Sequence, residues 1–285
     1  AVLYPLLAKL HVQAIVELGL HATGQQHDAA RDQGQIPADM LQDHHGIRNV
    51  QTGQADSLGR GNLRTMIVQP CNAFSENTVL LPDGEGGLVV IDPGYSSPEE
   101  WNTLDTLLAA EGLRPTAVLL THAHLDHVMG CHGMERRWGL RPRMDVLDLD
   151  TYAMAPPAAA LYGVSLDPLP QPLEAGFSEG EELAFGKLKL TVRHAPGHAP
   201  GHVVFIDDEH QRVIGGDVLF QGSIGRTDLP GGDPGVLRKS IEEVLYTLPD
   251  HYTVVPGHGP TTTIGAERAA NPFVNAAGSG MLQQG

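Results

Sequence analysis

The stretch THAHLDH, residues 121–127, places three imidazoles and one carboxylate within six positions: His122, His124, Asp126 and His127. Imidazole nitrogens and carboxylate oxygens suit zinc, iron and manganese, and polar groups crowded together without a partner are costly to bury. The stretch therefore indicates a metal site.

An apolar run at residues 117–120 comes directly before this stretch and predicts a buried parallel strand. Open α/β sheets place their ligands at the carboxyl ends of such strands. We expect His122 and His124 to turn toward one ion from the loop. Asp126 and His127 would begin the following helix and turn toward another ion.

Three further residues of ligand type end apolar segments in the same way. His198 follows the segment 188–192 within APGHAPGH, Asp217 follows VIGG, and His258 follows TVVPG. Any one of them alone would ordinarily be a loop residue hydrogen-bonded to backbone. Three such strand ends in one chain indicate a shared site.

Taken together, HxHxDH followed by separate His, Asp and His residues resembles the metallo-β-lactamase superfamily, from Met66 to about Val274. The resemblance implies an α/β fold, an αββα sandwich of two mixed sheets flanked by helices, with the site along one edge. It also implies two divalent metal ions, taken as Zn2+ with Fe or Mn as alternatives. The implied ligands are His122, His124 and His198 for the first metal, Asp126, His127 and His258 for the second, and Asp217 between them.

Other segments narrow the resemblance. Residues 216–229 (GDVLFQGSIGRTDL), the PGHGP turn at 256–260 and NPF at 271–273 are similar to the glyoxalase II branch, and more narrowly to short, single-domain hydroxyacylglutathione hydrolases. The lactamase branches carry another arrangement at Asp217, so antibiotic hydrolysis is expected only as a side activity. Full-length glyoxalase II has a C-terminal helical domain that binds glutathione. The 27 residues after His258 are too few for it, so we expect none here.

The implied ligand set predicts the chemistry. Two cations that share a water lower its pKa from about 15.7 to near neutrality, and the resulting bridging hydroxide can attack a carbonyl carbon. Asp126 could orient this hydroxide as a catalytic residue. A thiol with a pKa of about 8.5 leaves as a thiolate without a strong acid, and the sequence has no additional acid motif. We therefore expect a thioesterase that cleaves acyl-thioesters such as hydroxyacylglutathione.

Other functions fit parts of the same pattern. Persulfide dioxygenases share HxHxDH, the later His and Asp, and a GRTD stretch, but hold one iron, here through His122, His198 and Asp217. The intact His258 and the whole second-metal set favour the hydrolase. A promiscuous lactone, ester or β-lactam hydrolase of the same fold is a second alternative. A noncatalytic module fits less well, because structural zinc sites are closed.

Two residues beyond Asp217 are candidates for a role near the site. Arg226 either contacts a substrate carboxylate or forms a structural ion pair with Asp228, and the ion pair is favoured. In that case Asp228 would support the site from outside the metal ligands.

Two more candidates lie elsewhere in the chain. Tyr162, a candidate substrate contact, belongs to the Pro- and Ala-rich segment 145–172, which predicts either a lid or pocket wall or a satellite apolar cluster. His202, four residues after His198, either orients ligands from outside the metal shell or is a satisfied polar residue in a strand.

The chain is acidic, with a net charge of −16, and residues 66–285 carry 28 of its 34 acidic and 13 of its 18 basic side chains. Such a core repels phosphate backbones, and the sequence has no basic run or basic-aromatic stripe to offset this. We expect no nucleic-acid partner. The positive charges of two metal ions would offset part of the negative charge at the site, which leaves room for a small-molecule thioester or ester.

The rest of the chain predicts the domain organisation. Residues 1–65 form an N-terminal extension, partly helical or disordered and of unassigned function, followed by a hydrolase domain at 66–273 and a flexible tail at 274–285. The apolar residues of the first 20 positions recur at helical spacing, and the helix would pack on the core or on a second copy in a homo-oligomer. Residues 21–65 have no sustained period.

Local patterns also predict elements and compartment. The segments 78–81 and 87–91 predict a hairpin, and Ser97 before an acidic first turn predicts a helix that Gly112 ends. No run of 18 apolar residues indicates a membrane span, the first 20 residues do not read as an intact signal peptide, and Cys71 and Cys131 lack CxxC spacing. We therefore expect a cytoplasmic protein without a membrane partner.

Overall fold

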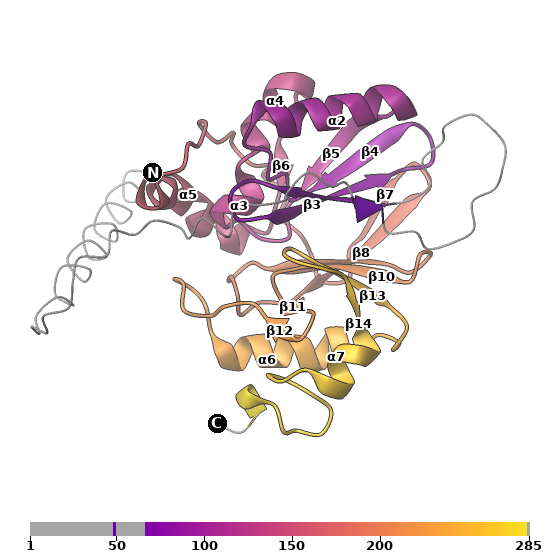
Figure 1. Ribbon diagram of the computed structural model, residues 1–285, viewed down its shortest axis with the longest axis vertical. Coiled ribbons are helices and arrows are strands. Elements are labelled where there is room, and N and C mark those ends of the chain that lie inside the picture. Colours follow the sequence, from indigo (N-terminus) through magenta and orange to yellow (C-terminus); the bar gives the residue numbers. More distant parts are fainter. Residues whose placement is uncertain (1–47, 50–65, 284–285) are drawn as a thin grey trace, which may run out of the picture. The chain divides into compact units, whose positions relative to one another are not determined.

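The computed structural model of the protein describes residues 48–49 and 66–283. Two β-sheets lie face to face, and helices cover their outer faces, as Figure 1 shows. Both sheets mix parallel and antiparallel strands, so the predicted αββα sandwich of two mixed sheets is confirmed.

The first sheet contains the predicted hairpin and the strand that precedes THAHLDH. Its strands, in sheet order, are β1 (Arg48–Asn49), β2 (Ile67–Cys71), β3 (Glu76–Pro82), β4 (Gly87–Ile91), β5 (Arg114–Leu119) and β6 (Pro142–Arg143). The pairs from β1 to β4 are antiparallel, whereas β4, β5 and β6 run parallel. Strand β5 is the predicted parallel strand, and its carboxyl end leads into His122.

The second sheet carries the other three predicted ligands at its strand ends. Its strands, in sheet order, are β14 (Thr262–Thr263), β13 (Thr253–Pro256), β10 (Arg212–Gly216), β9 (Val203–Asp207), β8 (Leu188–His194) and β7 (Glu182–Phe185). Strands β10 and β13 are parallel, so Asp217 and His258 emerge at the same edge. The ribbon of β11 (Leu219–Phe220) and β12 (Ser223–Ile224) follows Asp217 directly.

Apolar side chains from both sheets fill the space between them. Val89 and Ile91 of the first sheet and Phe205 and Val255 of the second are each 0% exposed within one cluster. Burying an aliphatic or aromatic side chain of this size contributes about 1.5–3 kcal/mol. This core fixes the two sheets against each other and so brings their strand ends together.

Helices cover the outer faces of both sheets (Figure 1). Helices α2 (Pro98–Glu111) and α4 (Cys131–Trp138) pack on the first sheet, and α6 (Pro234–Glu243) and α7 (Ile264–Ala270) on the second. Ser97 and Glu100 form a capping box at the start of α2, and Gly112 ends it with φ 65°, so the predicted helix is confirmed.

The Pro- and Ala-rich segment forms a helix beside the site. The short helix α3 (Leu125–Val128) carries Asp126 and His127, and α5 (Leu149–Tyr162) packs against it through buried Tyr152 and Ala155. This packing offsets two prolines inside α5, each of which costs about 3 kcal/mol in a helix interior. The segment thus contributes to an apolar cluster at the site's edge.

The C-terminal segment, expected as a flexible tail at 274–285, makes packing contacts over residues 274–283. Val274 is 0% exposed, and its carbonyl accepts a hydrogen bond from the Tyr246 hydroxyl at 2.7 Å. Gln283, at the end of the short helix η4 (Met281–Gln283), donates to the Glu242 carboxylate at 2.7 Å. Residues 274–283 therefore pack on the second sheet's helical layer, because an apolar side chain and several polar groups anchor them.

The prediction for the N-terminal extension lies largely outside the described residues, at 1–47 and 50–65. Arg48–Asn49 pair with β2 at the edge of the first sheet. Cys71 and Cys131 are both buried and free. Among the described residues, no helix has the length and apolar character that a membrane crossing needs.

Candidate metal centre

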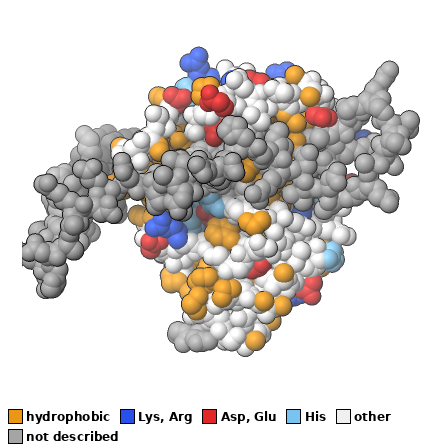
Figure 2. Space-filling view, in the orientation of Figure 1, with side chains coloured by type: hydrophobic (Ala, Val, Ile, Leu, Met, Phe, Trp, Pro, Cys, Tyr) orange, Lys and Arg blue, Asp and Glu red, His pale blue; other side chains and the backbone are white. Residues whose placement is uncertain are grey.

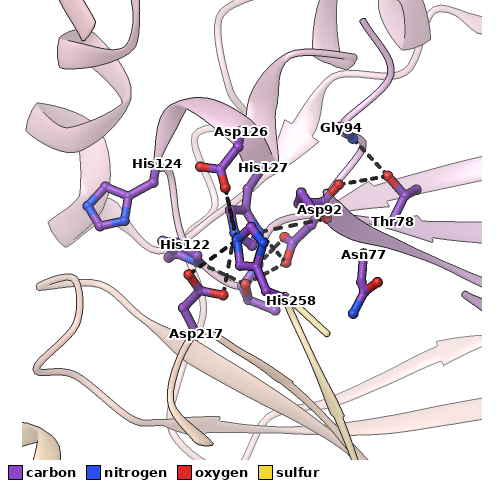
Figure 3. Close-up of polar contacts among 12 residues, drawn as sticks. Asn77, Thr78, Asp92, Gly94, His122, His124, Asp126, His127, Asp217 and His258 are labelled. Carbon is purple, nitrogen blue, oxygen red and sulfur yellow. Dashed lines mark hydrogen bonds and ion pairs between the residues drawn. The ribbon is translucent and has the colours of Figure 1, made fainter. Parts of the chain in front are cut away.

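The seven predicted ligands come from both sheets and meet at one edge of the sandwich. They follow β5, β8, β10 and β13: His122, His124, Asp126, His127, His198, Asp217 and His258. Figure 3 shows the side chains of Asp126, His127, Asp217 and His258 pointing toward one another. His124 lies to the left of this cluster in the view. The convergence predicted from separate strand ends is therefore present.

Three imidazoles form a first group. His198 Nε2 lies 2.8 Å from His124 Nδ1 and 3.2 Å from His122 Nε2. Ligand nitrogens around one tetrahedral ion lie about 3.3 Å apart, given bonds of about 2.0–2.1 Å. Burial lowers the pKa of His124 to about 3, and burial and neighbouring imidazoles lower that of His122. Both rings are neutral, which is the form that binds a metal.

A second group combines a carboxylate with two imidazoles. Asp126 Oδ2 lies 3.0 Å from His258 Nε2 and 3.7 Å from His127 Nε2. Ligand-type atoms of these three residues all lie within 4.8 Å of one another. The helical position of Asp126 and His127 on α3 turns both toward the second sheet, where His258 completes the group.

Buried atoms without partners mark where ions fit. Within residues 66–283, His127 Nε2 and Asp217 Oδ1 are buried and make no hydrogen bond, although they lie 3.6 Å apart. An unsatisfied buried polar atom costs about 1–3 kcal/mol. A cation between them would satisfy both, so the residues present fit a bound metal.

Asp217 lies between the two groups. Its Oδ2 is 3.4 Å from His198 Nε2 and 3.7 Å from His258 Nε2. Burial would raise the pKa of Asp217, but the facing His127 and His198 hold it far below its usual value, so the group is a carboxylate. A Cβ at Gly257 would lie 2.2 Å from Asp217 Oδ1, so only glycine leaves room for the carboxylate.

Asp92 orients His127 from outside the group. Its Oδ2 lies 3.1 Å from His127 Nδ1, and the backbone and hydroxyl of Thr121 donate to the carboxylate at 2.7 and 2.6 Å. A carboxylate on the far nitrogen fixes a ligand ring and its tautomer, here with Nε2 directed at the site.

Glu76 was not found from the sequence. It is 0% exposed, accepts from the Thr78 hydroxyl at 3.0 Å, and its Oε1 lies 3.9 Å from His127 Nδ1. Burial raises its pKa well above the usual value. Nothing in its local sequence, an ordinary strand start, signals this position, because the contact depends on how β3 packs beside α3.

Backbone carbonyls hold the far ring nitrogens of His198 and His258. His198 Nδ1 lies 2.8 Å from the carbonyl of Arg226, and His258 Nδ1 lies 3.2 Å from that of Phe74. Each contact fits an Nδ1–H donor, which leaves Nε2 free for the site. Asn77 braces the turn around His258 by donating to two carbonyls, those of Pro256 and Gly259.

His202 contacts the ligands without joining either group. Its Nε2 accepts the backbone N–H of Asp217 at 3.0 Å, and its ring stacks on His122 with centroids 4.7 Å apart. His202 is 1% exposed and lies directly before β9. A role in orienting ligands stays a prediction.

The candidate substrate contacts lie at the surface side of the site. Arg226 forms two hydrogen bonds of 2.7 Å with Asp228, and both side chains are more than half exposed. Bonding to Asp228 and contact with Tyr162 raise the pKa of Arg226. The Tyr162 ring meets that of Phe74 at 5.5 Å. Histidine atoms reach the surface between the two sheet layers (Figure 2).

Comparisons with known proteins show the family to which this chain is similar. A model of the metallo-β-lactamase superfamily matches residues 71–258. Hydroxyacylglutathione hydrolase GloC of Haemophilus influenzae is 36% identical over 208 residues, covering 73% of this chain and 96% of that protein. The crystal structure of TTHA1623 in a di-iron-bound form shares 44% identity and a TM-score of 0.64, covering 71% of this chain and 97% of that one. The BLEG-1 B3 metallo-β-lactamase shares 32% identity and a TM-score of 0.64, covering 74% and 99%.

Proposed function

Because the chain belongs to the metallo-β-lactamase superfamily and is a metal-dependent hydrolase, we propose that it cleaves acyl-thioesters at a two-metal centre. The observation that carries this proposal is the position of Asp217, within 3.7 Å of ring nitrogens from both ligand groups. A carboxylate in that position suits two ions better than one.

The proposed ligands follow the two groups. The first ion is assigned to His122, His124 and His198, the second to Asp126, His127 and His258, and Asp217 is shared. Zinc is the proposed metal, because imidazole and carboxylate ligands suit it, with iron or manganese as alternatives. The di-iron form of TTHA1623 supports a centre of two ions and supports iron as an alternative metal.

Bound there, two cations would supply Lewis acidity, which lowers the pKa of a water and polarises an acyl carbonyl. The chain's own residues prepare the site for this chemistry. The carboxylate of Asp126 faces it, 3.0 Å from His258 Nε2, and could accept a hydrogen bond from the attacking water and so orient it. Asp92 keeps the ring of His127 from turning.

A thioester is the proposed substrate class for two reasons. Thiolates leave near neutral pH without a protonated side chain to assist them. The similarity to hydroxyacylglutathione hydrolase GloC supports a hydroxyacyl thioester in particular. Arg226 and Tyr162 are the proposed contacts for the part of the substrate that reaches the surface, with Asp228 holding Arg226 in place.

Metal content and a substrate panel test the proposal. We expect about two ions per chain in protein purified without added metal or chelator, and turnover of lactoylglutathione or another acyl-thioester above that of a lactone, an ester or a β-lactam. A single iron per chain, with oxygen consumed in the presence of a persulfide, would replace the hydrolase by a dioxygenase. Two ions with faster turnover of the lactone, ester or β-lactam would refute the thioester preference.

A further inference from the structure

We propose that Asp148 is a positioning residue that fixes the distance and rotation between the two loops holding the first metal ion. The inference rests on the proposed function only in assigning an ion to His122, His124 and His198. It concerns how tightly that ion is held rather than which substrate is cleaved.

One carboxylate joins the two loops. Asp148 Oδ2 accepts the backbone N–H of Ala123 at 2.9 Å, and Oδ1 accepts that of Gly201 at 2.6 Å. Ala123 lies between His122 and His124, and Gly201 lies three residues after His198. Asp148 therefore contacts the backbone between two imidazoles of the first group and, on the other loop, three residues from the third.

A second contact joins the same loops at another point. The Val203 N–H donates to the Thr121 carbonyl at 2.8 Å, on the strand side. A single contact would leave the loops free to pivot about it, whereas two separated contacts fix their rotation as well. The ring nitrogens that meet at 2.8 and 3.2 Å need both restraints, because ligand rings must be held to within about 0.5 Å.

Helix capping does not account for this residue. Asp148 occupies the N-cap position of α5, where aspartate is common, but its side chain makes no capping hydrogen bond. Both carboxylate oxygens instead bond to other segments of the chain. Because α5 packs on α3, the carboxylate is attached to a helix that already contacts the ligand-bearing elements.

The charge of Asp148 supports a specific requirement for a carboxylate. Asp148 is 0% exposed, and burial raises its pKa to about 6, while hydrogen bonds from Gly201, Ala123 and Thr151 lower it. No cation contributes among the described residues. A buried charge of this kind is costly, and an asparagine of the same shape offers only one acceptor oxygen. Because two backbone N–H groups each need an acceptor oxygen on this one side chain, the position requires a carboxylate.

Gly201 is fitted to the same contact. A Cβ at Gly201 would lie 2.7 Å from the backbone nitrogen of Asp148 and 3.0 Å from its Oδ1. Any larger residue would push the carboxylate and the His198 loop apart. Gly201→Ala therefore perturbs the contact from the opposite side.

The test is the release of zinc from the zinc-loaded full chain, titrated with a chromophoric chelator. The release step that His124→Ala abolishes identifies the first ion. In Asp148→Asn we expect affinity at that step to fall about 10–100-fold, as for other residues that orient ligands, with the second step unchanged. Gly201→Ala should show the same selective loss.

Asp145→Asn is the matched control. Asp145 is a buried carboxylate three residues earlier, whose Oδ1 accepts from the Leu147 N–H at 2.9 Å and whose Oδ2 lies 3.1 Å from His194 Nε2. It should change thermal unfolding without changing zinc release. Unaltered release in Asp148→Asn and Gly201→Ala, or equal loss at both steps in all three variants, would overturn the proposal.

This readout separates the inference from the proposed function. Zinc release does not depend on the substrate, so loss of the first step with no thioesterase activity in the parent would support Asp148 and refute the thioester. If Asp148→Asn does not fold, zinc release from Gly201→Ala tests the proposal by itself. Gly201 does not have a positive φ, so an alanine can adopt its backbone conformation. Only the close contact with Asp148 opposes the substitution.

Discussion

At the scale of single residues, Asp217 and His127 balance each other's charge in the metal-free chain. The nearest ring nitrogen and carboxylate oxygen lie 3.6 Å apart, and both residues are buried. Burial would lower the pKa of His127, but the carboxylates of Asp126, Asp217 and Asp92 raise it well above its usual value. A proton thus occupies a position where a cation would bind.

Asp217→Ala should remove metal and activity together. The variant deletes a carboxylate whose oxygens lie within 3.7 Å of ring nitrogens from both ligand groups. We therefore expect metal per chain to fall toward zero and turnover to fall more than about 100-fold. Elemental analysis and a thioester assay measure both. Asp228→Ala, an exposed carboxylate on the same loop, should keep its metal. Turnover with full metal loading in Asp217→Ala would show that Asp217 is not a ligand shared by the two ions.

The two ions should respond differently to pH. Burial lowers the pKa of His258, but bonding to Asp126 raises it above its usual value, and that of His127 is also raised. Binding the second ion must therefore displace protons, and its affinity should fall about tenfold per proton for each unit that pH falls through these pKa values.

The first ion should lack this dependence over the same range. The pKa values of its ligands His122, His124 and His198 are lowered, chiefly by burial, so these rings are already neutral. Zinc affinity, measured by competition with a chelator at pH 6, 7 and 8, should depend steeply on pH for the second ion and hardly at all for the first. Two equal slopes would contradict the assigned protonation states.

The convergence of the seven candidate ligands was predictable from the sequence. Four stand in THAHLDH directly after an apolar strand, and the other three each end an apolar segment in a glycine-containing turn. The residues that orient them were not predictable from such a signal. Glu76, Asp92 and Asp148 reach the site through packing of distant segments, and a lone carboxylate at a strand or helix end reads as an ordinary turn residue or cap.

At the scale of elements, α2 supports the loop beside the site through its first turn. Glu100 accepts from the Ser97 N–H in the capping box and also from the Asn72 N–H at 2.6 Å. The Asn72 side chain in turn donates to the Asp126 carbonyl at 2.9 Å. The helix start and the ligand-bearing helix α3 are thus joined through one loop residue.

Ser97→Ala should weaken the fold and leave the metals in place. Loss of the N-cap oxygen removes a bond to the Glu100 N–H and costs about 1 kcal/mol of unfolding free energy. Urea unfolding measures the cost, and elemental analysis should still find the parental metal content. Thr106→Ala, at an exposed position in the middle of α2, should not destabilise the fold. Metal loss in Ser97→Ala would show a tighter coupling than the Asn72 contact implies.

Elements with a complete local signal were predictable, and the others depended on tertiary packing. The hairpin of β3 and β4, strand β5 and helix α2 each have both an apolar pattern and a turn or cap in sequence. Helix α5 contains Pro156 and Pro157, which argue against a helix, yet packing on α3 maintains it. Residues 274–283 have no periodic apolar pattern in the sequence. Isolated contacts hold them in place, and such contacts leave no sequence pattern.

At the scale of the whole molecule, residues 66–283 contain the core and every predicted ligand. The four apolar clusters lie entirely within this range. A chain that begins at Met66 should therefore fold, elute as a compact species and keep the parental metal content and turnover. Size exclusion and elemental analysis check this against the full chain. An aggregated product would show that the fold depends on residues 1–65.

Each proposed ion takes ligands from both sheets: His122 and His124 with His198 for one, Asp126 and His127 with His258 for the other. The ions would then act as reversible cross-links between two halves that are otherwise joined mainly by apolar packing. A ligand at 1,000 times its dissociation constant adds about 4 kcal/mol to the stability of the state that binds it. Chelation should therefore speed cleavage by a nonspecific protease, so that metal supply would set the lifetime of the chain as well as its catalysis.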